Sequence, residues 1–449
     1  MTERFVGWGR TAPSFATRAV PRDMDELVST VAAATPQRGI LVRGLGRSYG
    51  DAAQNAGGTI IDLTGWTRVI ALDTSAATIS VESGASIDQI MRLLLPHGLW
   101  LPVIPGTRQV TIGGAISADV HGKNHHARGS FGHHVLEIDL LTAQGELLTL
   151  RPQGDTAELF WATVGGMGLT GVITRATLSL TRVESSFFAV DTQRVPHIRE
   201  LIEMLASGDD AYEYSVAWFD TATSGNALGR AVLTRGRCAR VDELPERLHD
   251  TALDLADEHQ LALPFALPRS LVNRLSSRAF NALWFAKAPP RRDGEIQSVR
   301  QFLHPLDAVR DWNHVYGPRG FVQYQFVVPF GAEDAFVEAV QTIADSPHVS
   351  SLNVLKRFGE GSPAPLSFPM PGWTAAVDFP VKPGLHELLN SLDALVIAAG
   401  GRVYLAKDAR LSARSFEAMY PRAAEFRRTR DLHDPEHLFR SDLSRRLAL

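Results

Sequence analysis

A short apolar run that breaks into spaced glycines is the stretch of this sequence best suited to chemistry. It reads ILVRGLGRSYGD at residues 40–51 and places Gly44, Gly46 and Gly50 beside two arginines, Arg43 and Arg47. Glycines can adopt positive φ and carry no Cβ, so successive backbone N–H groups can converge on a phosphate. Each charge-assisted hydrogen bond of this kind contributes roughly 1.5–3 kcal/mol. The stretch predicts a cradle for a dinucleotide pyrophosphate, with a simple turn between strands as the alternative.

The glycine spacing differs from that of a nicotinamide-binding unit. The Rossmann fingerprint needs G-x-G-x-x-G opening directly into a helix. Here the third glycine comes one residue later, and residues 52–63 are rich in turn formers and then in β-branched side chains. We therefore expect the loop to join a strand to a strand, which disfavours a βαβ unit.

A second glycine-rich segment, PGTRQVTIGGAISADVHGKN at residues 105–124, lies less than a hundred residues further on. A large, flat, phosphate-bearing cofactor lying across several strand ends would need both segments. The histidines at 121, 125, 126, 133 and 134 suggest a metal site as an alternative. The sequence shows neither an H-x-x-x-H helix nor a carboxylate pair at ligand spacing near them, so we expect no metal.

The composition is that of an ordinary globular enzyme with two or three cores, since the chain has 449 residues. Its net charge of -4 argues against nucleic acid as the main partner. The single cysteine, Cys238, excludes an intrachain disulfide, and we expect it to be a buried small residue. Neither a spanning apolar run nor a signal peptide is recognisable, so we expect a soluble or peripheral protein.

The first part of the chain must supply the elements that hold the glycine segments. Periodicity and capping signals predict the following helices, strands and turn: a helix at 21–35, strands at 39–42, 68–72 and 78–82, a helix with Ser86 and Gln89 as its capping box, a strand at 135–142, a helix at 157–163, a glycine turn at 165–171 and a strand at 172–180.

From about Val183 the glycine density falls and aromatic residues increase, which indicates a domain boundary. Two β-α-β patterns follow, typical of an antiparallel sheet covered by helices on one side. Their expected elements are strands at 321–328, 351–358, 373–381 and 402–407 and helices at 332–344 and 385–399, with a final helix at 413–430. The stretch 261–293 is the least regular, and is either a surface excursion or a lid or membrane-facing patch that receives a lipid.

Eight motifs spread along the chain resemble the decaprenylphosphoryl-β-D-ribose 2-oxidase family of actinobacteria, within the vanillyl-alcohol-oxidase type of FAD enzymes. They are RGLGRSYGD, PGTRQVTIGGAI, HGKNHH, FWATVGGMGLTG, YSVAWFD, GFVQYQFVVP, PLSFPMPGW and YLAKDAR. The resemblance implies an α+β fold: an FAD-binding domain of residues 1–184 and 402–449, and an inserted antiparallel-sheet substrate domain of residues 185–401. Several related oxidases carry a flavin-linking histidine where this chain has Arg47, so non-covalent FAD is expected.

The resemblance also assigns site residues. Those expected to bind the cofactor are Arg43, Gly44, Leu45, Gly46, Arg47, Ser48, Tyr49, Gly50, Asp51, Gly106, Thr107, Thr111, Ile112, Gly113, Gly114, Ala115, His121, Gly122, Lys123, Asn124, Ile173 and Tyr404. Those expected to bind substrate are His121, Lys123, Trp218, Gln323, Val354, Phe358, Thr374 and Ala376.

Oxidising a secondary alcohol at a flavin needs a group that takes the hydroxyl proton and positive charge that stabilises the reduced flavin. Strand alternation places Val354, Lys356 and Phe358 on one face of their strand, and Gln323 and Gln325 on one face of theirs. With the resemblance, Lys407, Lys356, Tyr49 and Gln325 are the expected catalytic residues. Lys407 is assigned to the flavin and substrate hydroxyl, and Lys356 to polar groups of the sugar phosphate. Which group takes the proton stays open.

The sequence departs from the family pattern at a few positions. Many members carry a cysteine in the strand after PGW, where nitroaromatic inhibitors attach covalently, and this chain has Ala376 there. We expect turnover to persist and covalent inhibition to be lost. Thr374, His314 and Leu303 also differ from residues common in the family, which leaves fine substrate contacts open.

The resemblance implies FAD-dependent oxidation of the C2 hydroxyl of decaprenylphosphoryl-β-D-ribose to the 2-keto sugar. This is the first half of an epimerisation that supplies arabinose for cell-wall arabinan, with a membrane quinone as electron acceptor and a separate NADH-dependent reductase as partner. A peripheral membrane location on the periplasmic side is expected. A soluble alditol or aldonolactone oxidase that uses oxygen, and a flavin-binding scaffold without turnover, are the alternatives.

Overall fold

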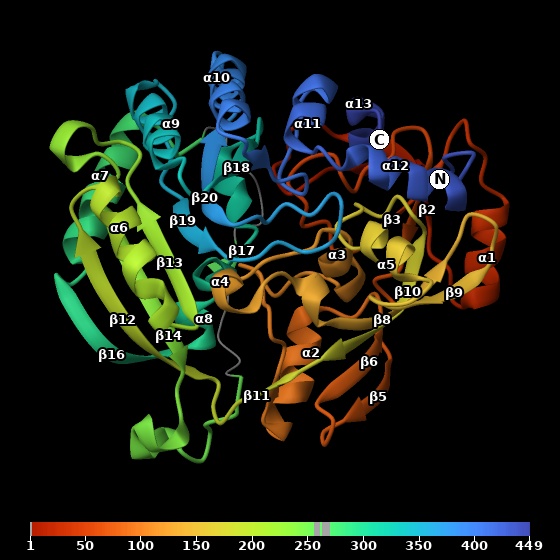
Figure 1. The fold of residues 1–449 in the computed structure, drawn as a ribbon, viewed down its shortest axis with the longest axis horizontal. Helices are drawn as coiled ribbons and strands as arrows, with labels where there is room; N and C mark the ends of the chain where they lie inside the picture. The colour runs from red at the N-terminus through yellow and green to blue at the C-terminus, as the bar shows by residue number, and fades with distance from the viewer. Residues whose placement is uncertain (1, 256–260, 263–269) are drawn as a thin grey trace.

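The computed structural model describes residues 2–255, 261–262 and 270–449. It is an α+β structure with two smaller sheets at one end and a large antiparallel sheet at the other (Figure 1). Both chain ends lie beside the smaller sheets. Among the described helices, none is long and apolar enough to cross a membrane.

The four-stranded sheet carries the first glycine segment. Its order is β1 (Thr2–Phe5), β2 (Ser14–Ala19), β4 (Thr59–Asp62), β3 (Ile40–Arg43), with β3 and β4 parallel. The loop after β3 leads to β4, so the expected strand-to-strand connection is confirmed. Helix α1 (Met24–Ala32) buries Leu27 and Val31 against this sheet, in a cluster that includes Phe439 from the other end of the chain.

The five-stranded antiparallel sheet lies next to it and follows the predicted pattern closely. Its order is β5 (Val69–Asp73), β6 (Thr78–Glu82), β10 (Val172–Ser179), β8 (Val135–Leu141), β9 (Leu147–Leu150). Helix α2 (Ile87–Leu94) begins at the predicted capping box, in which Ser86 accepts from the Gln89 amide and Gln89 accepts from the Ser86 amide. The remaining elements of this part are α3 (Ile112–Ser117), α4 (His125–Arg128), α5 (Ala157–Thr163) and the pair β7 (Leu99–Trp100) and β11 (Thr181–Arg182).

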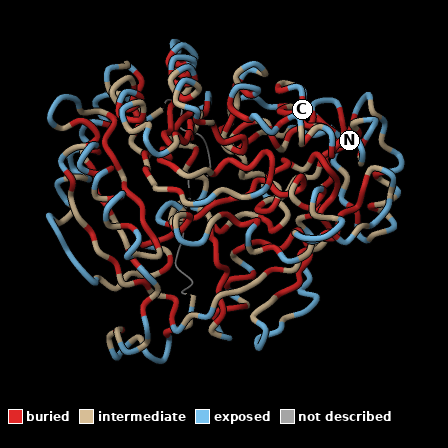
Figure 2. The backbone as a smooth tube through the Cα atoms, in the orientation of Figure 1, coloured by how far each residue is buried: buried red, intermediate tan, exposed pale blue. Residues whose placement is uncertain are grey.

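The large sheet has eight strands, all antiparallel, and confirms the predicted helix-covered antiparallel sheet. Its order is β16 (Arg291–Ser298), β12 (Phe187–Val195), β14 (Ala231–Cys238), β13 (Tyr214–Phe219), β19 (Asn353–Phe358), β20 (Gly372–Pro380), β18 (Phe321–Pro329), β21 (Arg402–Val403). Helices α6 (Ile198–Gly208), α9 (Glu333–Asp345) and α10 (Leu385–Ala398) form a connected row along it. Figure 2 shows that the central strands are buried whereas the outer edge at β16 is exposed.

The short helix α8 (Val299–Phe302) directly follows β16, and the pair β15 (Leu261–Ala262) and β17 (Val309–Arg310) also lies between β14 and β18 in the sequence. The C-terminal helices α11 (Ala413–Met419), α12 (Ala423–His433) and α13 (Asp442–Leu447) return to the N-terminal end, where Ile40 forms a bridge with Phe439. The proposed domain boundaries at residues 184 and 402 stay a prediction.

Four expectations about secondary structure were wrong. The strand expected at 402–407 ends at Val403, and the chain then turns, with the amides of Lys407 and Asp408 donating to the Tyr404 carbonyl. The single helix expected at 413–430 is two helices, because Pro421 lacks an N–H and restricts Tyr420 before it. The second glycine segment, 105–124, was expected to be a loop like the first, but it contains the helix α3.

The fourth error concerns the stretch 261–293, which is not irregular throughout. It contains α7 (Arg274–Lys287), which begins at Asn273, whose side chain accepts from the amides of Leu275 and Ser276. Residues 263–269 lie outside the described part. Cys238 on β14 was expected to be buried but is only partly buried. Even this partial burial raises the pKa of its thiol to about 12.

Candidate active site

The loop after β3 has the backbone features expected of an anion cradle. Gly46 has a φ of 65°, and the amides of residues 44 to 48 donate no hydrogen bond to another group in the described chain. A Cβ on Gly44 would lie 2.3 Å from Thr111 Oγ1, so only glycine allows this approach. Because a row of unpaired amides on a positive-φ turn suits a pyrophosphate, these residues fit FAD.

The two arginines of the loop have different surroundings. Arg43 donates through its two terminal nitrogens to the carbonyls of Ala53 and Val6, both at 2.8 Å, and so braces the loop. The Arg47 guanidinium lies 4.0 Å from the centre of the Trp8 ring, and its Nε has no hydrogen-bond partner among the described residues. Of the two arginines, Arg47 is therefore the one whose Nε–H can donate a hydrogen bond to a ligand.

The second glycine segment meets the first at Thr111. The Thr111 hydroxyl caps α3 by accepting from the Gly114 amide at 3.2 Å. The amides of Ile112 and Gly113 donate to the carbonyls of Ala85 and Ser83, so this helix start is already paired. The two glycine segments, about 60 residues apart in the sequence, therefore lie next to each other, as predicted.

The other residues expected at the cofactor lie around these segments with mixed environments. Leu45 and Gly106 are exposed, Ser48 and Thr107 are half-buried, and Gly122, Asn124 and Ala115 are buried. Ile173 is buried in β10, and the Tyr404 hydroxyl donates to the Ala118 carbonyl just after α3, at 2.8 Å. The Asp51 carboxylate is held by Arg446, at 2.7 and 2.9 Å.

Six of the eight expected substrate residues, all but His121 and Lys123, share one face of the large sheet. Pairing across β13, β19, β20 and β18 puts Trp218 opposite Val354, and Lys356 opposite Thr374. Ala376 pairs with both Val354 and Gln325. Since residues paired directly across antiparallel strands point the same way, the two faces predicted separately for β19 and β18 are a single surface. Trp218 turns its ring N–H to the Ser351 carbonyl at 3.0 Å.

His121 lies over this face and joins it to the second glycine segment. Gln325 Nε2 lies 2.9 Å from His121 Nε2, and Lys356 Nζ lies 3.0 Å from His121 Nδ1. The ring packs against Phe358, with ring centres 4.8 Å apart. Burial and the nearby lysines lower the pKa of His121 well below its usual value. A neutral imidazole has one donor and one acceptor nitrogen, so the ring is the donor in one of these two contacts and the acceptor in the other.

Three lysines approach the same region, and burial lowers the pKa of each amine to about 7. Lys407 Nζ lies 3.6 Å from the centre of the Tyr49 ring. Lys356 and Lys123 are half-buried, and the charge of Lys123 lowers the pKa of Lys356 further. Lys123 donates to the Phe302 carbonyl and lies 5.0 Å from the centre of that ring. Crowded, desolvated amines of this kind exchange protons near neutral pH.

A carboxylate that sequence reasoning missed belongs to this cluster. Asp378 on β20 is buried and accepts from Gln323 Nε2 at 2.6 Å and from the Tyr316 hydroxyl at 3.3 Å. Burial raises the pKa of its carboxyl group to about 7, and the charge of Lys407 opposes that rise. Strand alternation from Thr374 through Ala376 was the available signal, because it puts Asp378 on the substrate face.

The histidines near His121 have partners of other kinds. His126 Nε2 lies 2.9 Å from the Tyr212 carbonyl, and His134 Nε2 lies 2.9 Å from the Arg128 carbonyl. His125 packs on Phe358 with ring centres 4.4 Å apart. Among the residues that the structure describes, no group of three histidine, cysteine, aspartate or glutamate side chains is arranged to hold a metal ion.

Comparisons with known proteins agree with the geometry of the cradle. A family model described as an FAD binding domain matches residues 16–151. A decaprenylphosphoryl-β-D-ribose oxidase of Mycolicibacterium smegmatis is 48% identical over 100% of this chain and 98% of that protein. An uncharacterised protein of Streptomyces coelicolor is 39% identical over 81% of this chain and its whole length. An L-gulono-1,4-lactone dehydrogenase of Mycobacterium tuberculosis is 23% identical over 97% of this chain and 96% of that protein.

Proposed function

Because the chain belongs to the decaprenylphosphoryl-β-D-ribose oxidase family of FAD-binding oxidoreductases, we propose that it oxidises the C2 hydroxyl of decaprenylphosphoryl-β-D-ribose to the 2-keto sugar. The observation that carries the proposal is the convergence of Lys356, Lys407 and Gln325 beside the cofactor cradle. These side chains can bind an anionic sugar and exchange a proton at the same place.

Bound FAD would supply the hydride acceptor for the sugar carbon. The protein's own contribution begins with Lys407, whose pKa of about 7 leaves part of its amine neutral at physiological pH. A neutral amine can accept the hydroxyl proton as the C2–H bond breaks. The charge of Asp378 favours the protonated amine, and would therefore stabilise the positive charge that develops on Lys407.

Lys356 is suited to a different task in the same reaction. It lies on the substrate face beside Thr374 and touches His121, while its pKa is lowered by burial and by two neighbouring lysines. An incoming phosphate would restore its positive charge, because an anion favours the charged form of an amine. We assign Lys356 to the sugar phosphate, and Lys123 and His121 to the positioning of that group.

The finer parts of the proposal concern partners. The 2-keto product would pass to a separate NADH-dependent reductase that completes the epimerisation for arabinan synthesis in the cell wall. A membrane quinone would take the electrons from the reduced cofactor. Both assignments follow the family resemblance.

Peripheral membrane contact on the periplasmic side is also proposed, and the surface of α7 supports the contact. The helix is held by polar residues: Asn281 Nδ2 donates to Asp220 Oδ1 at 2.7 Å and to the Ser350 carbonyl at 3.2 Å. Leu275 and Leu283 face outward, 80% and 69% exposed, and Lys287 at the end of the helix is exposed as well. Outward apolar residues with basic neighbours suit a bilayer surface that delivers a lipid-linked sugar.

Anaerobic mixing tests the reaction. Purified holoprotein is mixed with the lipid-linked ribose or with simple polyols while the flavin absorbance is followed. Bleaching by the lipid substrate alone is the expected result. Bleaching by polyols would favour the alternative, a soluble alditol or aldonolactone oxidase that uses oxygen, and no bleaching by either would favour a scaffold.

Lys407→Ala tests the catalytic assignment in the same assay. The variant should keep its FAD, since Lys407 contacts Tyr49 by its amine and not through the cradle amides, but it should lose bleaching by substrate. Unimpaired flavin reduction in this variant would remove Lys407 from the mechanism.

A further inference from the structure

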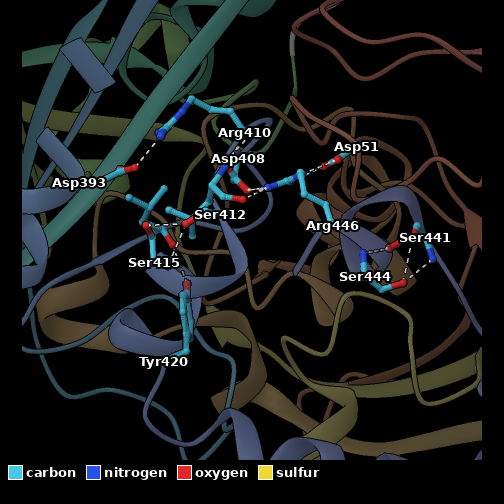
Figure 3. A network of polar contacts seen from close by, with 12 residues as sticks. Asp51, Asp393, Asp408, Arg410, Ser412, Ser415, Tyr420, Ser441, Ser444 and Arg446 are labelled. Atoms are coloured by element: carbon cyan, nitrogen blue, oxygen red, sulfur yellow. Dashed lines mark hydrogen bonds and ion pairs between the residues drawn. The ribbon is translucent and has the colours of Figure 1, made fainter. Parts of the chain in front are cut away.

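The C-terminal helix reaches the neighbourhood of Lys407 through one side chain. Arg446 of α13 lies between two carboxylates, as Figure 3 shows. Its Nε and one terminal nitrogen donate to Asp51, at 2.9 and 2.7 Å. Its other terminal nitrogen lies 2.8 Å from Asp408 Oδ2 and donates to the Leu411 carbonyl at 2.6 Å. The planar guanidinium thus bridges two acids that are 357 positions apart.

The two carboxylates belong to the two loops that hold Lys407 and Tyr49. Asp51 ends the first glycine segment, and Asp408 follows Lys407 directly. The backbones of these loops touch: the Tyr49 amide donates to the Ala406 carbonyl at 2.9 Å. A Cβ on Gly50 would lie 1.7 Å from the Asp408 carbonyl oxygen. Any shift of one loop relative to the other would therefore move the Lys407 amine relative to the Tyr49 ring.

The second oxygen of Asp408 holds the turn that carries Lys407. It accepts from the amides of Arg410 and Leu411, at 2.9 and 2.8 Å. Arg410 in turn donates to Asp393 of α10 at 2.7 Å, and Asp393 accepts from the Tyr324 hydroxyl at 3.0 Å. The network therefore runs from α13 to β18, the strand that carries Gln323 and Gln325.

We propose that Arg446 is a positioning residue for Lys407: by bridging Asp51 and Asp408 it fixes the Lys407 loop against the cofactor loop and aims the amine over Tyr49. The expected effect on catalysis rests on the proposed function, in which Lys407 takes the hydroxyl proton. The geometric part of the inference stands on the contacts alone, because Arg446 is the group that binds both loops at once through a fork that lysine lacks.

The structure offers a matched control on the same helix. Arg445 ties α13 to Asn55 Oδ1 at 2.6 Å and to the Arg38 carbonyl at 3.3 Å, and pairs with Asp442 of its own helix at 3.1 Å. None of these partners lies in residues 404–411. Arg445→Lys and Arg446→Lys each replace one guanidinium of α13 by an amine, so both weaken the docking of this helix. Only the second removes the bridge between Asp51 and Asp408, and both keep a positive charge where the arginine was.

Two measurements on the FAD-loaded full chain test the proposal. The first is the rate of reductive methylation at Lys407, read by mass spectrometry across neutral pH, which needs no substrate. Because only the neutral amine reacts, Arg446→Lys should move the pH midpoint of this rate upward, toward the value of a free lysine, and lower the rate at neutral pH, whereas Arg445→Lys should match the wild type. The second is flavin reduction by the lipid-linked ribose, whose kcat should fall about 100-fold in Arg446→Lys with little change in KM, the effect expected of a displacement near 1 Å.

The outcomes separate this inference from the proposed function. Wild-type protein that is not reduced by the sugar would refute the function, while the methylation rates would still test the positioning role. Equal Lys407 reactivity in Arg446→Lys and wild type would overturn the positioning role. If Arg446→Lys does not fold, Asp408→Asn replaces it, because the amide keeps the Oδ1 acceptor and loses the ion pair; unchanged Lys407 reactivity there would equally overturn it.

Discussion

Replacing Lys356 with methionine should change stability and substrate binding in opposite directions. Lys356 lies in the same charged cluster as Lys123 and Lys407, and its amine contacts His121 Nδ1 at 3.0 Å. Methionine has a similar length and volume but carries no charge. The variant therefore removes the electrostatic penalty of this lysine and keeps most of its packing.

The size of the effect follows from the shift of the Lys356 pKa from 10.5 to about 7. A shift of this size means that the buried charge of Lys356 destabilises the folded protein by at most about 5 kcal/mol. Because the side chain is partly exposed to water, screening reduces this penalty to about half. Loss of the His121 contact offsets about 1 kcal/mol. The variant should thus be more stable than the wild type by roughly 1–2 kcal/mol at low pH.

The sign of this difference depends on pH. Below about pH 7 the lysine is protonated in both the folded and the unfolded wild type, so the full penalty applies. Between about 7 and 10.5 the folded protein loses the proton while the unfolded chain keeps it, and the wild type gains stability. Above 10.5 both are neutral, the penalty is gone, and only the lost His121 contact remains. The variant should then be the less stable of the two.

Urea unfolding of the holoprotein, followed by tryptophan fluorescence on both sides of neutral pH and at high pH, measures these differences. Lys287→Met is the control, because that lysine is exposed at the end of α7 and should show no pH-dependent difference. In the reduction assay Lys356→Met should raise KM about tenfold or more, as expected for a lost charge-assisted bond. A Lys356→Met protein that is less stable than the wild type at low pH would refute the electrostatic reasoning.

Three further predictions concern other parts of the site. Gly50→Ala places a Cβ 1.7 Å from the Asp408 carbonyl oxygen and should lower the ratio of bound FAD to protein, measured by absorbance. Gly65→Ala, which meets nothing within 4 Å, should keep the wild-type ratio, and equal ratios in both variants would contradict the close contact. Asp119→Ala removes a carboxylate that accepts from Ser130, Ser362, Ser367 and the Gly132 amide, and should destabilise the protein by roughly 3–5 kcal/mol; an unchanged melting temperature would argue against this hub. After incubation with a nitroaromatic inhibitor of the family, mass spectrometry should find no stable adduct on the wild-type protein and a stable adduct on Ala376→Cys. An adduct on the wild-type protein would show that residue 376 does not decide covalent attachment.

Local patterns predicted much of the fold correctly. The strand Thr78–Glu82 and the helix Ala157–Thr163 have the predicted bounds, and the capping box at Ser86 forms as expected. Such features depend on side-chain periodicity and on hydrogen bonds within a few residues, which a sequence displays directly. The failures at residues 404–407 and at Pro421 came where a buried turn and a proline ended elements that the apolar pattern would have continued.

The types of the site residues could also be predicted, but their relations could not. Sequence alternation placed Lys356 and Gln325 each on one face of its own strand, and the motifs of the family supplied Lys407 and Tyr49. Only the register between strands shows that these faces are one surface, and that Asp378 belongs to it. A one-residue slip of any strand would turn its side chains to the other face, and nothing local in the sequence records the register.

The sequence by itself therefore determined the chemistry available to this protein: a glycine cradle for a pyrophosphate, and lysines for an anionic sugar. Tertiary structure decided what those groups do, because burial sets the pKa of each lysine near 7 and long-range contacts set their positions. Arg446 and Asp51 are 395 positions apart and meet only when the C-terminal helix docks on the first loop. Pairing at that distance depends on the packing of the whole chain.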